Sequence, residues 1–584
     1  MHSTVARRVP LRRSSCDAAT TRSVAPLAVS ERNDRILLTA ALGGFLAYAA
    51  AFIYRTSFVI DGERYFSLFD DAMVSMRYAR NLADGYGLVW NPGGEIVEGY
   101  TNPLWVLYMT VLHLLPVAPS KTSVLVQATA ALCLALNLYY VRRIALVIGG
   151  GVRPVAWGAL ALTALYLPIN FWSLQGMEVG VLTLLMTTCT WVAICGMDSG
   201  RFQPRLYILL GVGTLVRPDI VVAFLAFLSF MVLADATHRR QHAVWGGVVL
   251  ICAVAGQTLF RLWYYGDFLP NTYYLKMTGV PLSIRITRGV YVALQFVWRA
   301  SPLLFVLTGL LALRPDRRIR LVLWTLAAQI TYSVYVGGDA WEYWGGSNRY
   351  IAIAMPGFFA LLSYALYRGA RTLGRFRSEL SSPLAWNRTS MLVFVLGVLY
   401  ALIAFNSIHG PEALAEVALL RPPLHTGPGG SNHQDVQEAL LLRSATAPEA
   451  SIAVVRAGTI PYFVERRTID LLGKNDRFIA HAAAVVGPDG TLGYRDFRPG
   501  HMKFDFAYSI GQLQPDVIVQ LRRRTALAKP FLEAGDYKDV LVAGRCLQAR
   551  RDSPHVSWTW LPATGCAAPE EDSEALEPSS GAVR

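Results

Sequence analysis

Two adjacent carboxylates, Asp70 and Asp71, are the first groups in this chain that could do chemistry. They follow an apolar residue and begin a predicted short amphipathic helix, where acidic side chains face the positive end of the helix dipole. Such a pair is also an ordinary way to begin a helix. The helix lies in a polar loop at residues 55–102 and could rest on a membrane surface with its carboxylates at the water boundary.

Four further polar clusters occur at the ends of apolar segments, at residues 176–178, 217–219, 265–276 and 337–350. They supply carboxylates, cationic side chains and tryptophans. A hydroxyl nucleophile needs a carboxylate base, and a phosphate leaving group needs cations as its charge develops. Each cluster also has an ordinary interpretation as a structural ion pair, an interfacial anchor or an aromatic belt. The hypothesis that these clusters form one chemical site depends on all of them facing the same side of the membrane.

The composition predicts a polytopic α-helical membrane protein. Of 584 residues, 53% are hydrophobic and 16% are charged, whereas soluble proteins are about 25% charged. Apolar runs of about 20 residues recur along the chain, which is the length that a membrane-spanning helix needs. The net charge is +14, but the basic residues are scattered over short loops. They therefore predict membrane topology and no nucleic-acid surface.

About eleven crossings are expected between residues 35 and 408. We place them near residues 36–54, 122–140, 154–170, 177–196, 243–264, 290–312, 319–336, 349–368 and 389–408, with two short helices within 205–233. Residues 103–117 are interpreted as a re-entrant or surface segment. A cytoplasmic N-terminus then puts the basic loops inside and every polar cluster outside. The loop at 55–102 contains seven acidic and four basic residues, as an outside loop should.

The two ends of the chain differ from this membrane part. Residues 1–34 are expected to be a disordered, basic cytoplasmic tail, and residues 567–584 a second disordered tail. Residues 409–566 predict an extracytoplasmic α/β domain, with a helix near 436–442 and strands near 452–455, 517–519 and 540–542. Cys546 and Cys566 in this domain could form a disulfide or remain separate thiols.

The string FDDAMVSMRYARNLADGYGLVWNPGGEIVEGYTNPLW resembles the first extracytoplasmic loop of GT-C glycosyltransferases. It is most similar to the family that includes the terminal β-(1→2)-arabinofuranosyltransferases of the mycobacterial and corynebacterial envelope. Later strings similar to the family's (GME, RPD, YGDFLPNTYYLK and GGD) follow in the family's order. The string AGTIPYFVERRTIDLLGKND in the distal domain also looks like the family's. The resemblance covers about residues 36–545.

The resemblance implies an enzyme of the bacterial plasma (inner) membrane with a GT-C fold. It would transfer a sugar from a polyprenyl-phosphate donor, on the outer face, to an envelope glycan or glycolipid. Asp70 or Asp71 would be the base, and Asp70 is favoured. The donor phosphate would contact Arg217, Lys276 and Arg349, and the sugar site would be shaped by Glu178, Asp219, Asp267 and Asp339. The remaining substrate-binding candidates are Arg77, Asn91, Glu98, Tyr100, Asn102, Trp105 and Asn271.

Two points stay open at this stage. The GGD loop has extra aromatic and glycine residues compared with the family, so arabinofuranose is not assumed as the sugar. The sequence implies no cofactor with certainty, although a divalent metal could bind such carboxylates.

Three other hypotheses make different predictions. A transporter or flippase of lipid-linked sugars predicts internal repeats and charges at mid-membrane. We find no clear repeat, and the charges lie at the ends of the spans. A non-catalytic envelope assembly subunit predicts that Asp70→Asn leaves function intact. A ligase that moves whole glycans would share the chemistry but need a wider acceptor groove.

Overall fold

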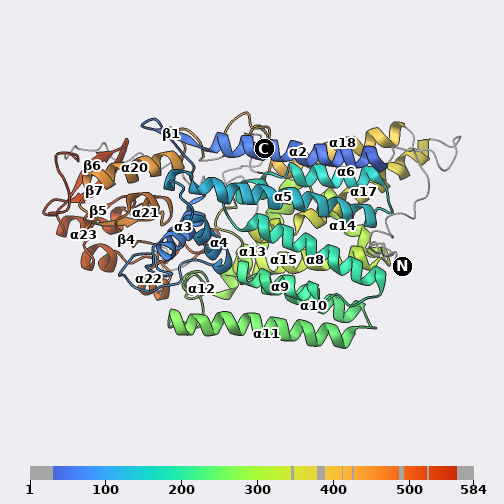
Figure 1. The fold of residues 1–584 in the computed structure, drawn as a ribbon, viewed down its shortest axis with the longest axis horizontal. Coiled ribbons are helices and arrows are strands. Elements are labelled where there is room, and N and C mark those ends of the chain that lie inside the picture. Colours follow the sequence, from blue (N-terminus) through green and yellow to red (C-terminus); the bar gives the residue numbers. More distant parts are fainter. Residues whose placement is uncertain are drawn as a thin grey trace, which may run out of the picture.

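The computed structural model describes residues 31–342, 348–377, 388–408, 410, 412–423, 426–485, 492–521 and 525–561. Figure 1 shows a bundle of long helices lying side by side and a smaller α/β part at one end of the bundle. Short helices from the bundle's loops lie at the junction between the two parts. Of the tails predicted at 1–34 and 567–584, residues 1–30 and 567–584 lie outside these ranges. Residues 31–34 were wrongly assigned to a disordered tail, because the first long helix already begins at Glu31. Cys566, one of the two cysteines of the possible Cys546–Cys566 disulfide, also lies outside the described ranges.

The bundle is built from apolar helices of very different lengths. They are α2 (Glu31–Thr56), α5 (Pro119–Ile148), α6 (Arg153–Ala164), α7 (Leu167–Leu174), α8 (Val179–Ser199), α9 (Arg205–Val216), α10 (Ile220–Ala234), α11 (Arg239–Tyr264), α13 (Leu282–Ala300), α14 (Pro302–Gly309), η1 (Leu310–Leu313), α15 (Arg317–Val336), α17 (Met355–Arg377) and α18 (Arg388–Asn406).

The helix lengths support a multi-pass membrane protein. Among the described residues, six helices are long and apolar enough to cross a membrane, namely α2, α5, α8, α11, α15 and α18. The number rises to eight if the bent pairs α6–α7 and α13–α14 each count as one span. The expected number of about eleven is therefore not confirmed. The segment at 205–233 forms two short helices, α9 and α10, as expected.

The sharpest bend, 96° between α13 and α14, has a local cause. Ser301 has φ at +109°, a conformation that an L-residue rarely adopts, and it precedes Pro302. Proline has no N–H to continue the helix and disfavours a helical conformation at the residue before it.

Short elements carry the polar clusters at the junction. They are the hairpin β1 (Phe58–Ile60) and β2 (Glu63–Tyr65), and the helices α3 (Asp70–Ala83), α4 (Pro103–His113), α12 (Asn271–Met277) and α16 (Arg349–Ala352). The hairpin turns at Asp61 and Gly62, which both have positive φ as a type I′ turn requires. Helix α4 has 11 residues, too few to cross a hydrocarbon core about 30 Å thick.

The C-terminal part confirms the predicted α/β class. Its helices are α19 (Glu412–Val417), α20 (Ser431–Ala445), α21 (Thr459–Val464), α22 (Arg477–His481), the π-helix η2 (Ala507–Gln512) and α23 (Thr525–Ala534). Its strands are β3 (Ser451–Val454), β4 (Arg467–Asp470), β5 (Val517–Ile518), β6 (Tyr537–Val542) and β7 (Arg545–Arg550). The strand order is β4-β3-β5-β7-β6, with β3 parallel to β4 and β5, and β7 antiparallel to β5 and β6.

The two faces of this sheet belong to different apolar cores. Side chains alternate across a strand, so Ile452 and Val454 join the large core that continues into the helix bundle. Ala453 and Val455 join a smaller core on the other face. The C-terminal domain is therefore packed onto the bundle through shared apolar burial.

Candidate active site

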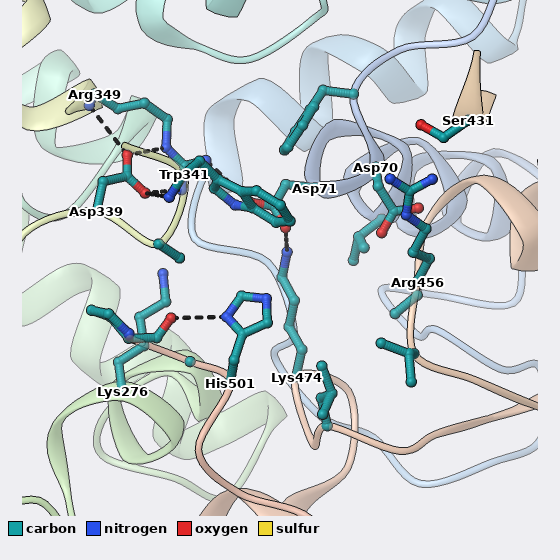
Figure 2. Close-up of a pocket in the computed structure, with 18 of the residues that line it drawn as sticks. Asp70, Asp71, Lys276, Asp339, Trp341, Arg349, Ser431, Arg456, Lys474 and His501 are labelled. Carbon is teal, nitrogen blue, oxygen red and sulfur yellow. Dashed lines mark hydrogen bonds and ion pairs between the residues drawn. The ribbon is translucent and has the colours of Figure 1, made fainter. Parts of the chain in front are cut away.

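A pocket lies where the loops of the bundle meet the C-terminal domain (Figure 2). The bundle side of its lining includes Phe69, Asp70, Asp71, Phe171, Lys276, Asp339, Trp341 and Arg349. The C-terminal domain contributes Ser431, Asn432, Arg456, Asp470, Lys474 and His501. Residues about 400 positions apart in the chain thus share one polar cavity.

Asp70 caps a helix of the other domain with one of its two carboxylate oxygens. Its Oδ1 accepts hydrogen bonds from the backbone N–H groups of Gly458, at 3.1 Å, and Thr459, at 2.8 Å, at the start of α21. A side chain at Gly458 would come within 1.9 Å of the Asp70 carbonyl oxygen, so only glycine permits this approach. The other oxygen, Oδ2, accepts no hydrogen bond from any described residue. Burial raises the pKa of Asp70 to about 6, although the positive charge of Arg456 opposes this.

Asp71 has the opposite surroundings. Its Oδ1 lies 2.9 Å from Lys474 Nζ, and its Oδ2 lies 3.1 Å from Arg349 Nη1. Burial alone would raise the pKa of this carboxyl, but Lys474, Arg349 and Lys276 together hold it well below its ordinary value. Two neighbouring carboxylates in one pocket therefore have pKa values shifted in opposite directions, a pattern that is typical of catalytic sites.

Arg349 is fixed between two carboxylates. Its Nε and Nη2 donate to the two oxygens of Asp339 at 2.7 and 2.9 Å, while Nη1 reaches Asp71. The guanidinium also lies over the ring of Trp172, 5.0 Å from its centroid. Because three side chains, Asp339, Asp71 and Trp172, hold the guanidinium, it presents its charge to the pocket in one orientation.

Two lysines complete the cationic side of the pocket. Lys276 comes from α12, and burial together with the charges of Arg349 and Arg217 lowers its pKa to about 8. Within the ranges that the structure describes, its ammonium has no hydrogen-bond or ion-pair partner. Lys474 comes from the loop between β4 and α22 and pairs with Asp71.

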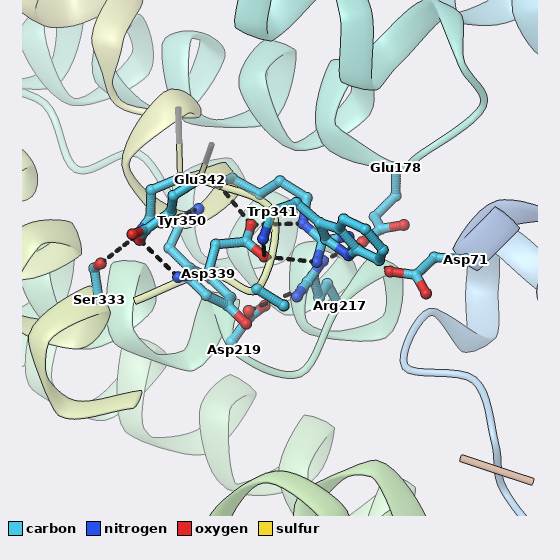
Figure 3. Close-up of polar contacts among 12 residues, drawn as sticks. Asp71, Glu178, Arg217, Asp219, Ser333, Asp339, Trp341, Glu342 and Tyr350 are labelled. Atoms are coloured by element: carbon cyan, nitrogen blue, oxygen red, sulfur yellow. Dashed lines mark hydrogen bonds and ion pairs between the residues drawn. The ribbon is translucent and has the colours of Figure 1, made fainter. Parts of the chain in front are cut away.

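A second network lies beside the pocket (Figure 3). Arg217 donates through Nη1 to Glu178 and through Nε to Asp219 at 2.8 Å. Asn102 donates to the other Glu178 oxygen at 2.9 Å. Arg217 and Asp219 border a smaller cavity together with Arg349 and Tyr350. These side chains are therefore adjacent to the main pocket and form its supporting wall.

The other candidate residues lie outside the pocket lining and hold its walls together. Glu98 pairs with Arg261 at 2.7 Å, and Tyr100 shares a hydrogen bond of 2.9 Å with Tyr265. The Trp105 indole N–H donates to the carbonyl of Gly176 at 3.0 Å.

Four candidates fasten the bundle loops to the C-terminal domain. Arg77 donates to the carbonyl of Arg466 at 2.9 Å, and Asn91 pairs with the backbone of Thr468. Asp267 pairs with Arg477 at 2.9 Å. Asn271 donates to the carbonyl oxygens of residues 473, 474 and 476.

The residues of the C-terminal domain were missed as site candidates. Arg456, Asp470, Lys474 and His501 line the pocket, yet no periodicity or spacing relates them to Asp70. The one signal was the string at 457–476, which includes Asp470 and Lys474 and resembled the family's without assigning them a role.

A divalent metal does not fit the arrangement of these carboxylates. In the described ranges no three histidine, cysteine, aspartate or glutamate side chains converge as metal ligands. Asp71 and Asp339 instead share Arg349 as their counterion. We therefore derive no step through a metal.

Comparison with known proteins gives partial matches in sequence and a broad match in fold. A domain family of unknown function, DUF8728, matches residues 428–558. The terminal beta-(1->2)-arabinofuranosyltransferase of Mycobacterium tuberculosis is 29% identical over 221 residues, which cover 35% of this chain and 34% of that protein. The enzyme of the same name from Corynebacterium glutamicum is 26% identical over 323 residues, covering 46% of this chain and 44% of that one. The chain thus matches less than half the length of these relatives.

Two solved structures share the architecture of nearly the whole chain. ArnT from Cupriavidus metallidurans, bound to undecaprenyl phosphate, has a TM-score of 0.52 at 13% identity, covering 90% of this chain and 99% of ArnT. The oligosaccharyltransferase AglB from Archaeoglobus fulgidus, in complex with an inhibitory peptide and a dolichol-phosphate, has a TM-score of 0.51 at 10% identity, covering 89% of this chain and 75% of AglB. The chain therefore has the GT-C fold of these membrane glycosyltransferases, and part of its sequence is related to terminal β-(1→2)-arabinofuranosyltransferases.

Proposed function

We propose that this protein is an integral membrane glycosyltransferase of the GT-C type. It transfers a sugar, with arabinofuranose as the first candidate, from a polyprenyl-phosphate donor to a hydroxyl of a cell-envelope glycan or glycolipid. The reaction takes place at the outer face of the plasma membrane, with the N-terminus in the cytoplasm and the C-terminal domain outside. The fold and the named relatives support this class of activity.

One observation about the site carries the proposal. Asp70 has a raised pKa, and its Oδ2 accepts no hydrogen bond from the described part of the chain, whereas the adjacent Asp71 is paired with cations. A general base works best when its pKa lies near the working pH, so Asp70 is suited to accept a proton. The cations around Asp71 are suited to stabilise a phosphate.

The proposed step is a single displacement at the anomeric carbon. The acceptor hydroxyl gives its proton to Asp70 Oδ2 while its oxygen forms the new bond to the anomeric carbon. The bond from that carbon to the phosphate oxygen breaks, and its electron pair stays on the phosphate, which leaves with the lipid. Arg349 and the lysines face the charge that develops there.

The test is transfer of radiolabelled sugar by the purified protein in detergent, from a panel of polyprenyl-phosphate sugars that includes arabinofuranose. Asp70→Asn should reduce transfer on the order of a hundredfold or more, with donor binding retained. Asp71→Asn should change mainly the KM for the donor. Asp84→Asn is the matched control, because Asp84 is an exposed carboxylate at the far end of α3.

Two outcomes would contradict the proposal. Wild-type rates in Asp70→Asn would remove Asp70 as the base. No transfer from any donor, combined with movement of lipid-linked sugar across a liposome membrane, would replace the glycosyltransferase by the transporter or flippase.

A further inference from the structure

We infer that the C-terminal domain completes the site for the donor's phosphate, with Lys474 as a third phosphate-binding cation beside Arg349 and Lys276. The inference rests on the proposed function and extends it, because it makes the lipid phosphate a ligand that both parts of the protein bind together. The sequence does not indicate that Lys474 and Lys276 share a site, since several membrane helices and a domain boundary separate them along the chain.

The charges in the pocket point to an anionic ligand. The pocket is lined by four cationic side chains and four carboxylates, but these charges are unevenly placed. Arg456 lies beside Asp70, and Asp470 accepts from backbone N–H groups of its own loop. Arg349, Lys276 and Lys474 are grouped around the other two carboxylates, Asp71 and Asp339. Asp339 is held by Arg349, and Asp71 is shared between Arg349 and Lys474. The ammonium of Lys276 is left without a partner in the part of the chain that the structure describes. A cation withdrawn from water without a counterion is costly, so an anion bound next to the ammonium of Lys276 would be stabilised there.

The loop that presents Lys474 is held by a dense set of hydrogen bonds. Asp470 accepts from the backbone N–H groups of Leu472 at 2.9 Å, Gly473 at 3.1 Å and Asn475 at 2.8 Å. The side chain of Lys474 is 24% exposed, with its ammonium 2.9 Å from Asp71. The backbone on both sides of Lys474 is therefore fixed while its charge points into the pocket, as Figure 2 shows.

Helix α12 links the two lysines directly. Asn271, at the start of α12, donates its amide hydrogens to the carbonyl oxygens of Gly473 and Lys474, both at 3.0 Å. Lys276 lies in the same seven-residue helix. The element that carries one lysine thus holds the loop that carries the other, so the distance between their two charges is set by the protein and not by the ligand.

The ligand that fits these groups is a phosphate rather than a sugar. Sugar hydroxyls are neutral and gain little from several converging cations. The donor's phosphate is a diester whose single negative charge is shared by two non-bridging oxygens, and these can accept from the Arg349 fork and from the lysine ammonium groups at once. Asp71 already places one carboxylate oxygen on Lys474 and one on Arg349, which shows that a single anion can bridge the two domains here.

The experiment measures binding of undecaprenyl phosphate and of undecaprenol, which lacks the phosphate, to the full-length protein in detergent. Lys474→Met should weaken binding of undecaprenyl phosphate roughly tenfold to a hundredfold and leave undecaprenol binding unchanged. Lys474→Arg should restore most of the loss. Lys529→Met is the control, since Lys529 is a 70% exposed lysine of the same domain.

The outcomes separate this inference from the proposed function. Equal binding of undecaprenyl phosphate by wild type and Lys474→Met would overturn the inference, even if sugar transfer is observed. Equal losses for the phosphate and the alcohol would also overturn it, because they would indicate a structural role. If binding of undecaprenyl phosphate depends on Lys474 but no sugar is transferred, the proposed function would be wrong while this inference would stand. If Lys474→Met does not fold, Lys474→Gln keeps a hydrogen bond to Asp71 and must show the same selective loss.

Discussion

At the scale of single residues, the surroundings of Asp70 and Asp71 predict a distinct pH dependence of transfer. Asp70 must be ionised to accept a proton, and burial raises its pKa to about 6. We therefore expect kcat/KM to rise with pH through about 6 and to fall again from about pH 8, where Lys276, whose pKa is lowered to about 8, loses the charge that binds the donor phosphate. Titration of Asp71 should cause no change of rate in this pH range, because the pKa of Asp71 is held well below its ordinary value. The measurement is the transfer rate from about pH 5 to above about pH 8, and a flat profile would contradict the role of Asp70.

The same residue should limit the stability of the protein. The pKa of Asp70 is higher in the folded protein than its ordinary value of 3.8, so the folded state binds this proton more tightly than the unfolded state. By linkage, stability from this group is present below about pH 4 and is lost as the pH rises through about 6. Asp70→Asn should thus raise the unfolding midpoint at neutral pH while transfer is lost.

Thermal unfolding in detergent, followed at neutral and at acidic pH, tests this expectation. The asparagine can still accept from the N–H groups of Gly458 and Thr459, so the helix cap is kept. The difference in unfolding midpoint between Asp70→Asn and wild type should become smaller at acidic pH, because Asp70 is then neutral in the wild type as well. A lower midpoint for Asp70→Asn at neutral pH would indicate that the charge stabilises the fold.

At the scale of elements, the link between α12 and the 470–476 loop predicts a coupling between Asn271 and Lys474. Asn271→Ala leaves three carbonyl oxygens without their donor, so the loop loses its position and donor KM should rise about tenfold. In a double-mutant cycle, Asn271→Ala should reduce donor affinity much less in the Lys474→Met background than in the wild type. Additive losses in donor affinity would show that Asn271 does not act through Lys474.

The sequence predicted those elements whose signal is local. The start of α3 at Asp70, the long apolar helices, the helix within α20, and strands at β3, β5 and β6 all follow from periodicity or composition. The amphipathic pattern of α3 would also allow it to lie along a membrane surface. It is instead buried, with α4 and α21 packed against it, because the C-terminal domain covers this helix. The number of membrane crossings was predicted less well, since bends and short helices weaken a signal based on length.

The sequence predicted the part of the site that the bundle contributes, but not the part that the C-terminal domain contributes. The polar clusters of the bundle lie together because they all occur at one end of its helices. Lys474 and Arg456 reach the pocket only through docking of a sheet loop about 400 residues away. Contacts of that separation leave no trace in local propensity or spacing, so a single sequence cannot place them.

At the scale of the whole molecule, Arg77 is one of the buried side chains that connect the bundle to the C-terminal domain. Its guanidinium donates to the carbonyl oxygens of Pro461 and Arg466 in that domain, and to Trp90 and Asn91 in its own loop. Only 2% of Arg77 is exposed. Buried carbonyl oxygens that lose a charged donor cost about 1–3 kcal/mol each.

Arg77→Met should therefore loosen the domain contact that positions Lys474. We expect faster hydrogen exchange in peptides from residues 457–476, a lower unfolding midpoint and weaker binding of undecaprenyl phosphate. Arg80→Met, one turn further along α3, is the matched control. Arg80 also contacts the C-terminal domain, through Tyr462 and Glu465, but its Glu465 partner is 37% exposed and can be hydrated after the change. Equal exchange in the two variants would contradict a special role for Arg77, whereas faster exchange confined to Arg77→Met would show that donor binding depends on how firmly the two parts are docked.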